Sequence, residues 1–361
     1  MIVGSIKENI EVEKRVSVTP ESAKNIIALG LKVYIEKGYA LHLGINDEEY
    51  KNVGVEIKNS SEILSSSNLI TKVNCPSEDE ISILKEDSIL VGMLNPSKNK
   101  NDIDKIINKK IKTFSLELLP RITRAQSMDI LSSQANLAGY KAVVDSFAFF
   151  QKAIPMMMTA AGTISAAKVL VVGAGVAGLQ AIATAKRMGA IVHATDVRSA
   201  SKEQVESLGG KFLMVEGSEN LETEGGYAKE TSEDFQKKQE DLLKETLKKI
   251  DIVICTALIP GKKAPIIIKK EMIEVMQNGS VIYDLAASQG GNSELTIADE
   301  IKEYNGVKIM GDRNILNKLP ISASNLYAKN MFNFINNMFN KEKKTFEINS
   351  EDEIINKTKV K

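Results

Sequence analysis

The chain has 361 residues, 43% of them hydrophobic, which predicts about two domains with full-sized cores. Its 47 Lys and Arg residues balance its 47 Asp and Glu residues, which argues against a nucleic-acid-binding surface and a polybasic membrane anchor. Two histidines and two widely separated cysteines, Cys75 and Cys255, favour a reducing compartment and argue against a disulfide or a zinc site.

Residues 1–136 predict an N-terminal α/β domain. A strand begins at Ile2, so no signal peptide is expected, and Thr19 followed by Pro20 is typical of a helix start. That helix is expected to end at Gly30. Further strands are predicted at residues 31–35, 68–73, 88–92 and 111–114. The alternation of strands with polar helical segments predicts a parallel sheet with helices on its faces.

The connection between the domains is predicted at residues 120–136, as a loop that continues into a long helix. The segment that follows, residues 153–185, is apolar enough for a hydropathy window to suggest a membrane span. Pro155 and Lys168 interrupt it, whereas a span needs about 20 unbroken apolar residues. We therefore expect a chain that is soluble by itself, with no direct membrane insertion.

A glycine pattern, Gly-x-Gly-x-x-Gly, is formed by Gly173, Gly175 and Gly178. An apolar strand at residues 169–172 precedes it and helix-forming residues 179–188 follow it, which is the context of a dinucleotide-binding turn. Gly173 would permit the tight turn, Gly175 would admit a pyrophosphate, and Gly178 would let the helix pack on the strand. The N–H groups of the helix N-terminus would face the phosphates.

The next strand, residues 191–195, ends at Asp196, close to the usual position of a ribose-binding acid. A carboxylate there would accept hydrogen bonds from the adenosine ribose of NAD(H) and repel the 2′-phosphate of NADP(H). Arg198 follows two residues later and could weaken that repulsion. The sequence thus predicts a preference for NAD(H).

Residues 137–321 are predicted to form this nucleotide-binding domain. Its remaining strands are predicted near residues 211–215, 251–256, 281–285 and 307–310. Residues 216–230 are acidic and glycine-rich, which predicts a mobile surface loop, and Tyr227 could lie over a cofactor as part of a lid.

The C-terminal part predicts a helix at about residues 322–340 and a poorly ordered polar tail at residues 341–361. The helix carries an apolar stripe, expected to complete the N-terminal domain, of Leu326, Met331, Phe334, Ile335, Met338 and Phe339. The predicted fold is therefore α/β, with two Rossmann-like doubly wound parallel-sheet domains joined by long helices.

Residues 121–140, Arg-Ile-Thr-Arg-Ala-Gln-Ser-Met-Asp-Ile-Leu-Ser-Ser-Gln-Ala-Asn-Leu-Ala-Gly-Tyr, closely resemble one family. It is the NAD(H)-binding component (domain I) of the proton-translocating nicotinamide nucleotide transhydrogenase. Residues 152–163, 224–230 and 256–261 strengthen the resemblance, which extends over residues 1 to about 340 and is more specific than the glycine pattern.

The resemblance implies direct, Si-specific (AB-specific) hydride transfer between NADH and NADP⁺, coupled to proton translocation. It implies a separate subunit, the first portion of a split alpha subunit, that binds NAD(H), while a partner beta subunit binds NADP(H). A homodimer is implied, cytoplasmic, at the inner face of the bacterial cell membrane through a membrane-spanning partner. Such transfer needs two C4 atoms held roughly 3–3.5 Å apart, and neither an acid, a base nor a metal from the protein.

By the same resemblance, Arg121, Gln126, Asp129 and Ser132 form the catalytic loop around the nicotinamide. Arg121 would balance pyrophosphate charge, Asp129 and Ser132 would fix the carboxamide, and Gln126 would reach toward the partner's nucleotide. The further cofactor-binding residues implied are Ser127, Met128, Gly173, Gly175, Val176, Ala177, Gly178, Asp196, Val197, Arg198, the lid residues Gly226 and Tyr227, and the adenine-side Leu258.

Alanine dehydrogenase is the alternative, because the chain is also similar to that enzyme. Arg15 and Lys72 match its substrate-binding arginine and lysine, but Asn95 and Ser288 stand where it has a histidine and an aspartate. Oxidative deamination needs a proton acceptor, which an asparagine cannot be. We therefore expect Arg15 and Lys72 to be charges kept inside the first domain by ion pairing. A non-enzymatic NAD sensor is a third class, and the nicotinamide-orienting loop argues against it.

Overall fold

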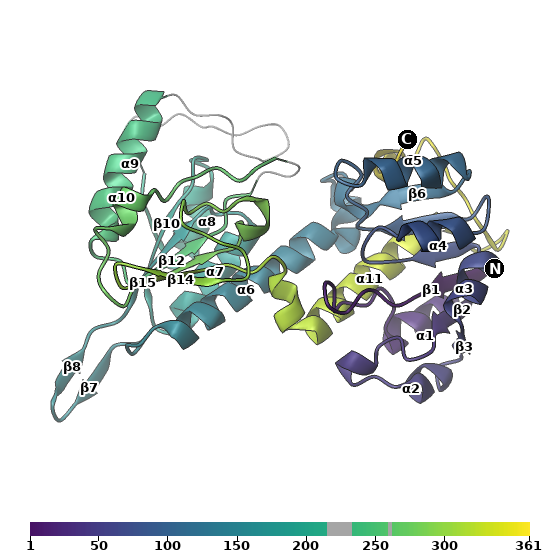
Figure 1. Cartoon of the computed structure of the whole chain (residues 1–361), viewed down its shortest axis with the longest axis horizontal. Helices are drawn as coiled ribbons and strands as arrows, with labels where there is room; N and C mark the ends of the chain where they lie inside the picture. Colours follow the sequence, from purple (N-terminus) through teal and green to yellow (C-terminus); the bar gives the residue numbers. More distant parts are fainter. Residues whose placement is uncertain (215–232, 259–261) are drawn as a thin grey trace. The chain divides into compact units, whose positions relative to one another are not determined.

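The computed structural model describes residues 1–214, 233–258 and 262–361 (Figure 1). It divides into two compact units, the first made of Met1–Gln134 with Leu316–Lys361 and the second of Ala135–Ile315. The predicted boundaries, at residues 136 and 321, lie within a few residues of these. None of the described helices combines the length and the apolar character that a membrane crossing requires.

A six-stranded parallel sheet, in the order β3-β2-β1-β4-β5-β6, forms the centre of the first unit. Its strands are β1 (Ile2–Ser5), β2 (Lys32–Glu36), β3 (Glu56–Lys58), β4 (Leu69–Thr71), β5 (Ile89–Gly92) and β6 (Lys112–Ser115). The predicted parallel sheet is confirmed. The sequence did not predict β3, because a strand with one apolar residue carries no alternating pattern.

The helices between these strands are α1 (Pro20–Ala28), α2 (Asp47–Lys51), α3 (Ser60–Ser66), α4 (Glu78–Ile83) and α5 (Lys100–Asn108). The predicted start of α1 is confirmed, since Thr19 caps it through a hydrogen bond from the backbone N–H of Ser22 and Pro20 is its first residue. Gly30, with φ of +85°, lies two residues beyond its last helical residue, as expected for a helix stop.

The C-terminal helix α11 (Pro320–Met338) packs into the hydrophobic core of the first unit, as predicted. Leu326 is an exception, because 38% of its surface is exposed and the adjacent Tyr327 is fully buried instead. The prediction for Leu326 was wrong, because the buried face repeats as Tyr327, Met331, Phe334 and Met338, which is a stripe of helical period beginning one residue later.

Residues 341–361 are not the poorly ordered tail that their polar composition predicted. Strand β16 (Phe339–Asn340) pairs with β17 (Thr345–Phe346), and helix α12 (Glu353–Thr358) follows. Ile354 and Ile355 are buried in the core, and the backbone of Val360 donates to Thr113 beside the edge strand β6. A few well-placed apolar residues thus anchor a segment whose average composition is polar.

The second unit is built on a sheet whose order, over the described residues, is β11-β10-β9-β12-β13-β15-β14. Its strands are β9 (Lys168–Val172), β10 (Ile191–Thr195), β11 (Lys211–Phe212), β12 (Ile252–Cys255), β13 (Val281–Asp284), β14 (Ile301–Tyr304) and β15 (Val307–Met310). All neighbouring strands are parallel except β14 and β15, which are antiparallel. The doubly wound fold is confirmed, and β14 was not predicted.

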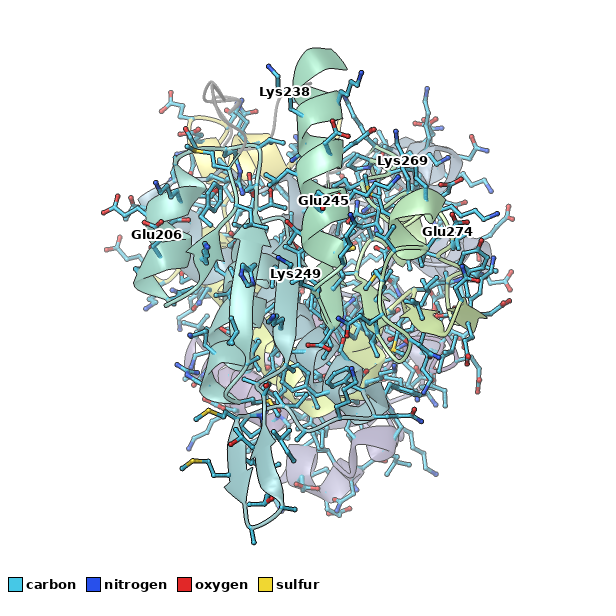
Figure 2. All side chains as sticks on the ribbon, turned by 90° about the vertical axis from the view of Figure 1, so that its left-hand side faces the viewer. Glu206, Lys238, Glu245, Lys249, Lys269 and Glu274 are labelled. Atoms are coloured by element: carbon cyan, nitrogen blue, oxygen red, sulfur yellow. The ribbon has the colours of Figure 1, made fainter. Side chains whose placement is uncertain are left out.

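Helices accompany this sheet, and a separate hairpin extends from the unit (Figure 1). The helices are α6 (Ile130–Phe149), which begins in the first unit, α7 (Val176–Arg187), α8 (Ser201–Ser207), α9 (Glu233–Leu247) and α10 (Lys270–Ile273). Figure 2 shows Lys238 and Glu245 on α9 close to Lys269, and Lys269 forms an ion pair with Glu240 at 2.5 Å. This face therefore carries both charge signs.

The hairpin consists of β7 (Met157–Thr159) and β8 (Gly162–Ile164), and its residues are exposed. The sequence did not predict it, because a two-stranded hairpin with no buried face leaves no alternation of apolar and polar residues.

Arg15 and Lys72 are buried and ion-paired inside the first unit, as expected. Arg15 Nη2 lies 2.7 Å from Glu13 Oε2, and the two side chains are 4% and 2% exposed. Lys72 Nζ lies 2.9 Å from Glu80 Oε2 and 3.8 Å from Glu8 Oε2. Carboxylates of the chain itself thus occupy both cations.

The Glu8→Gln substitution is expected to stabilise the chain at pH 8 and to have little effect at pH 5. Burial raises the pKa of Glu8 from its ordinary 4.5 to about 7, although Lys72 partly opposes this. Because the folded pKa is the higher one, the native state binds more protons between these values, and the contribution of Glu8 to stability is lost as pH rises through 7. Chemical denaturation across this range measures the difference, with Glu11→Gln, an exposed residue of the same segment, as control. A pH-independent effect would contradict the assignment.

Candidate cofactor-binding site

The glycine turn between β9 and α7 has the geometry that its sequence predicted. Gly173 has φ of +94°, and a Cβ atom there would lie 2.7 Å from Thr256 Oγ1. A Cβ atom at Gly178 would lie 1.9 Å from Gly173 O, so the helix can approach the strand only with glycine here. A Cβ atom at Gly175 would meet none of the described atoms within 4 Å. The turn therefore leaves an open face at Gly175, where a pyrophosphate fits.

The first turn of α7 presents backbone N–H groups at this open face. Gly175 is the N-cap, and no side chain of the described residues caps the helix. Val176 is 41% exposed and Ala177 is half-buried. The N–H groups of a first helical turn and the positive end of a helix dipole favour a bound anion.

Asp196, directly after β10, is bonded to both the glycine turn and Arg198. Its Oδ2 accepts hydrogen bonds from Ala174 N at 2.7 Å and Arg198 Nη2 at 2.7 Å, and its Oδ1 accepts from Arg198 N and Nε, each at 2.9 Å. Burial alone would raise the pKa of Asp196, but these donors, Arg198 above all, hold it below its ordinary value. The carboxylate is therefore ionised at neutral pH, and the half-buried Val197 separates the pair.

Leu258 lies near the end of β12 and is 39% exposed. The residue before it is held by Asn292, whose Oδ1 accepts from Ala257 N at 3.0 Å and whose Nδ2 donates to Ala257 O at 2.8 Å and Pro265 O at 2.9 Å. Asp284 holds Asn292 in turn, through its backbone N–H at 2.7 Å. Sequence analysis missed Asn292, whose only signal is its place after two glycines beyond β13. The predicted lid residues Gly226 and Tyr227 lie outside the described residues.

The residues predicted for the nicotinamide end lie in the first unit, around the 3₁₀ helix η3 (Thr123–Met128) and the start of α6. Asp129 and Ser132 are brought together, since Asp129 Oδ2 accepts from Ser132 Oγ at 2.6 Å and Oδ1 accepts from Ser132 N at 2.9 Å. This pair begins α6 in the manner of a helix cap.

The other residues of this loop differ in exposure. Arg121, Gln126 and Ser127 are exposed. Met128 is 6% exposed and belongs to the core of the first unit, so its backbone rather than its side chain faces outward. The predicted site residues thus form two groups, one around Asp129 in the first unit and one around Asp196 in the second.

The chemistry that these groups support is orientation and charge balance. Among the described residues no cluster of three or more His, Cys, Asp or Glu side chains could hold a metal ion. What is present is an open helix N-terminus, a ribose-side carboxylate and an exposed arginine, which together fit the phosphates and riboses of a dinucleotide.

Comparison with known proteins gives a consistent result over the whole chain. Residues 4–138 match the family model "Alanine dehydrogenase/PNT, N-terminal domain", and residues 142–360 match "Alanine dehydrogenase/PNT, C-terminal domain". The first portion of the split NAD(P) transhydrogenase subunit alpha of Rhodospirillum rubrum is 47% identical, over 99% of this chain and 95% of that protein. The crystal structure of transhydrogenase from Sinorhizobium meliloti superposes with a TM-score of 0.89 at 44% identity, over 99% of this chain and 98% of that one. An alanine dehydrogenase of Methanococcus maripaludis is 29% identical over 81% of this chain and 74% of its own length.

Proposed function

The chain belongs to the alanine dehydrogenase/PNT family and, within it, to the NAD(P) transhydrogenase alpha subunits, and from this premise we propose that it binds NAD(H) for direct hydride transfer. The hydride passes between NADH on this chain and NADP⁺ on a partner subunit, and the transfer is coupled to proton translocation across a membrane. The observation that carries the nucleotide assignment is the hydrogen bond of Asp196 to the glycine turn at Ala174, 2.7 Å long, beside the open face at Gly175.

Each group of residues has a defined part in this proposal. Bound NAD(H) supplies the nicotinamide ring that gives or takes the hydride. The N–H groups at the start of α7 bind the pyrophosphate with Arg121, and Asp196 holds the adenosine ribose. The Asp129–Ser132 pair orients the carboxamide, and the exposed Gln126 points toward the second nucleotide. The protein then positions two rings and needs no proton-transfer group.

The assembly that we propose follows from the alpha-subunit relatives and from the exposed hairpin. The chain acts as the first portion of the alpha subunit of an Si-specific (AB-specific) enzyme, with a membrane-spanning subunit and an NADP(H)-binding beta subunit as partners at the cytoplasmic face. A homodimer is supported by β7 and β8, where Met157, Met158 and Ile164 are 40%, 82% and 41% exposed. Apolar side chains gathered on one projecting hairpin are typical of a protein–protein contact. Light scattering of the purified chain tests this state.

The alanine dehydrogenase alternative is not favoured. Its relatives are more distant, and the two cations that match its substrate site, Arg15 and Lys72, are occupied by carboxylates of this chain. Asn95, which stands in the place of the catalytic histidine, uses its backbone N–H to contact Glu117 at 2.5 Å and offers no titratable side chain.

The test mixes the purified chain with an NADP(H)-binding transhydrogenase subunit and an NADH analogue. Hydride exchange only in the mixture, together with tighter binding of NADH than of NADPH by the chain alone, supports the proposal. Turnover of alanine by the chain alone would overturn it. NADH binding without exchange in the mixture would point to a sensing module instead.

Asp129→Asn is expected to slow hydride exchange about tenfold or more while changing NADH affinity much less. Asparagine can still cap α6, but it removes the charge and one acceptor for Ser132. Arg121→Ala is expected to show the same order of effects. Stopped-flow exchange and NADH titration measure the two quantities, with Asp104→Asn on the exposed side of α5 as control. Equal losses of rate and affinity would indicate a plain binding role.

A further inference from the structure

The loop around the nicotinamide is held by a stripe of asparagines on α11. Asn330, Asn333 and Asn337 are spaced by three and four residues, so they share one helix face. Asn330 Nδ2 and Asn333 Nδ2 both donate to Ser127 O, each at 2.8 Å. Two side-chain amides of one helix thus converge on a single carbonyl near the end of η3.

The same stripe reaches the beginning of η3 through the C-terminal segment. Asn337 Nδ2 donates to Asp352 Oδ2 at 3.3 Å, and Asp352 forms an ion pair with Arg124. Asp352 also caps α12, through a hydrogen bond from Ile354 N at 2.9 Å. Helix α11 therefore holds both ends of the 3₁₀ helix that carries Gln126.

A buried chain of hydrogen bonds fixes Asn330 itself. Its Oδ1 accepts from Ser133 Oγ at 2.7 Å, and Ser133 Oγ lies 3.5 Å from Gln134 Nε2. Gln134 Oε1 accepts from Arg15 Nη1 at 3.1 Å, and Arg15 is paired with Glu13. The amide of Asn330 is thereby oriented, with its donor toward Ser127.

A 3₁₀ helix of this kind has poor internal hydrogen-bond geometry and depends on outside contacts for its conformation. Ser127 lies one residue after Gln126 and two before Asp129, so a rotation of its peptide would move both side chains. We propose that Asn330 and Asn333 are positioning residues for hydride transfer, acting through the carbonyl of Ser127. The inference rests on the proposed function of this loop.

The variant that tests the proposal is Asn333→Ala, with Asn336→Ala, on an exposed part of the same helix, as its control. Asn333→Ala is expected to lower the hydride exchange rate at saturating nucleotides by about tenfold, since small misplacements cost rate steeply. The dissociation constant for NADH and the melting temperature are expected to stay close to those of the control. Asn330→Asp, which keeps the acceptor for Ser133 but loses the donor to Ser127, is expected to lower the rate at least as much.

Amide hydrogen exchange of residues 123–129 provides a readout that needs no activity. It is expected to rise in Asn333→Ala and to remain unchanged in Asn336→Ala. If both variants matched the wild type in exchange rate and in amide protection, the positioning role would be overturned. If the wild-type chain transferred no hydride while Asn333→Ala still loosened residues 123–129, the proposed function would fail and the structural link would stand.

Discussion

Asp196→Ala is expected to weaken NADH binding by roughly tenfold to a hundredfold and also to lower the melting temperature of the free chain. The carboxylate is 6% exposed and accepts hydrogen bonds from Ala174 and Arg198. Its removal leaves a buried N–H and a guanidinium without that partner, a loss of about 1–3 kcal/mol in unfolding free energy. NADH titration and thermal denaturation measure the two effects.

The prediction for selectivity follows from the same contacts. Two carboxylate oxygens have about four acceptor positions, and Ala174 and Arg198 already supply four donors. A ribose hydroxyl can therefore bind Asp196 only if the Arg198 guanidinium gives way. Without the carboxylate, the arginine is released from Asp196 beside the ribose position, so NADPH affinity is expected to rise relative to NADH.

Asp251→Ala is the matched control for Asp196→Ala. Asp251 accepts a backbone N–H from Lys168 at 2.9 Å, but it precedes β12 and so lies at the opposite edge of the parallel sheet. The control is expected to lose stability and keep its nucleotide affinities. If both variants bound NADH as tightly as the wild type, the ribose contact would be misassigned.

The features that sequence predicted well are those formed by neighbouring residues. The glycine turn is one continuous stretch, and its steric demands at Gly173 and Gly178 depend on the strand and helix directly beside it. Asp196 could be located because the end of a strand fixes where the next side chain is placed. The cap of α1 by Thr19 is local for the same reason.

Contacts between distant residues could not be predicted from one sequence. Asn292 lies 35 residues after Ala257, and Asn330 lies 203 residues after Ser127, and each acts through a side-chain amide with no pattern of its own. Composition misled for the tail, because its average polarity hid Ile354 and Ile355. The roles of the nicotinamide-side residues came from resemblance, and they stay predictions.

Glu13→Gln is expected to cost about 3–5 kcal/mol of unfolding free energy, the largest stability effect among the predicted variants. The variant leaves the Arg15 guanidinium buried, 4% exposed, with its charge no longer balanced by the bidentate carboxylate. Arg15→Met is expected to cost a similar amount for the opposite reason, while the double variant recovers most of the loss, because no unpaired charge remains. Chemical denaturation of the four proteins completes a double-mutant cycle.

The contrast with an exposed pair decides whether burial is the cause. Lys51 and Glu48 approach to 2.6 Å, as closely as Arg15 and Glu13 at 2.7 Å, but their side chains are 50% and 71% exposed. Glu48→Gln is expected to change stability only slightly, since water screens the pair and solvates the remaining charge. Similar losses in Glu48→Gln and Glu13→Gln would contradict the argument. Because Arg15 also donates to Gln134, Arg15→Met should slow hydride exchange even when the folded fraction is held equal by working well below the melting temperature.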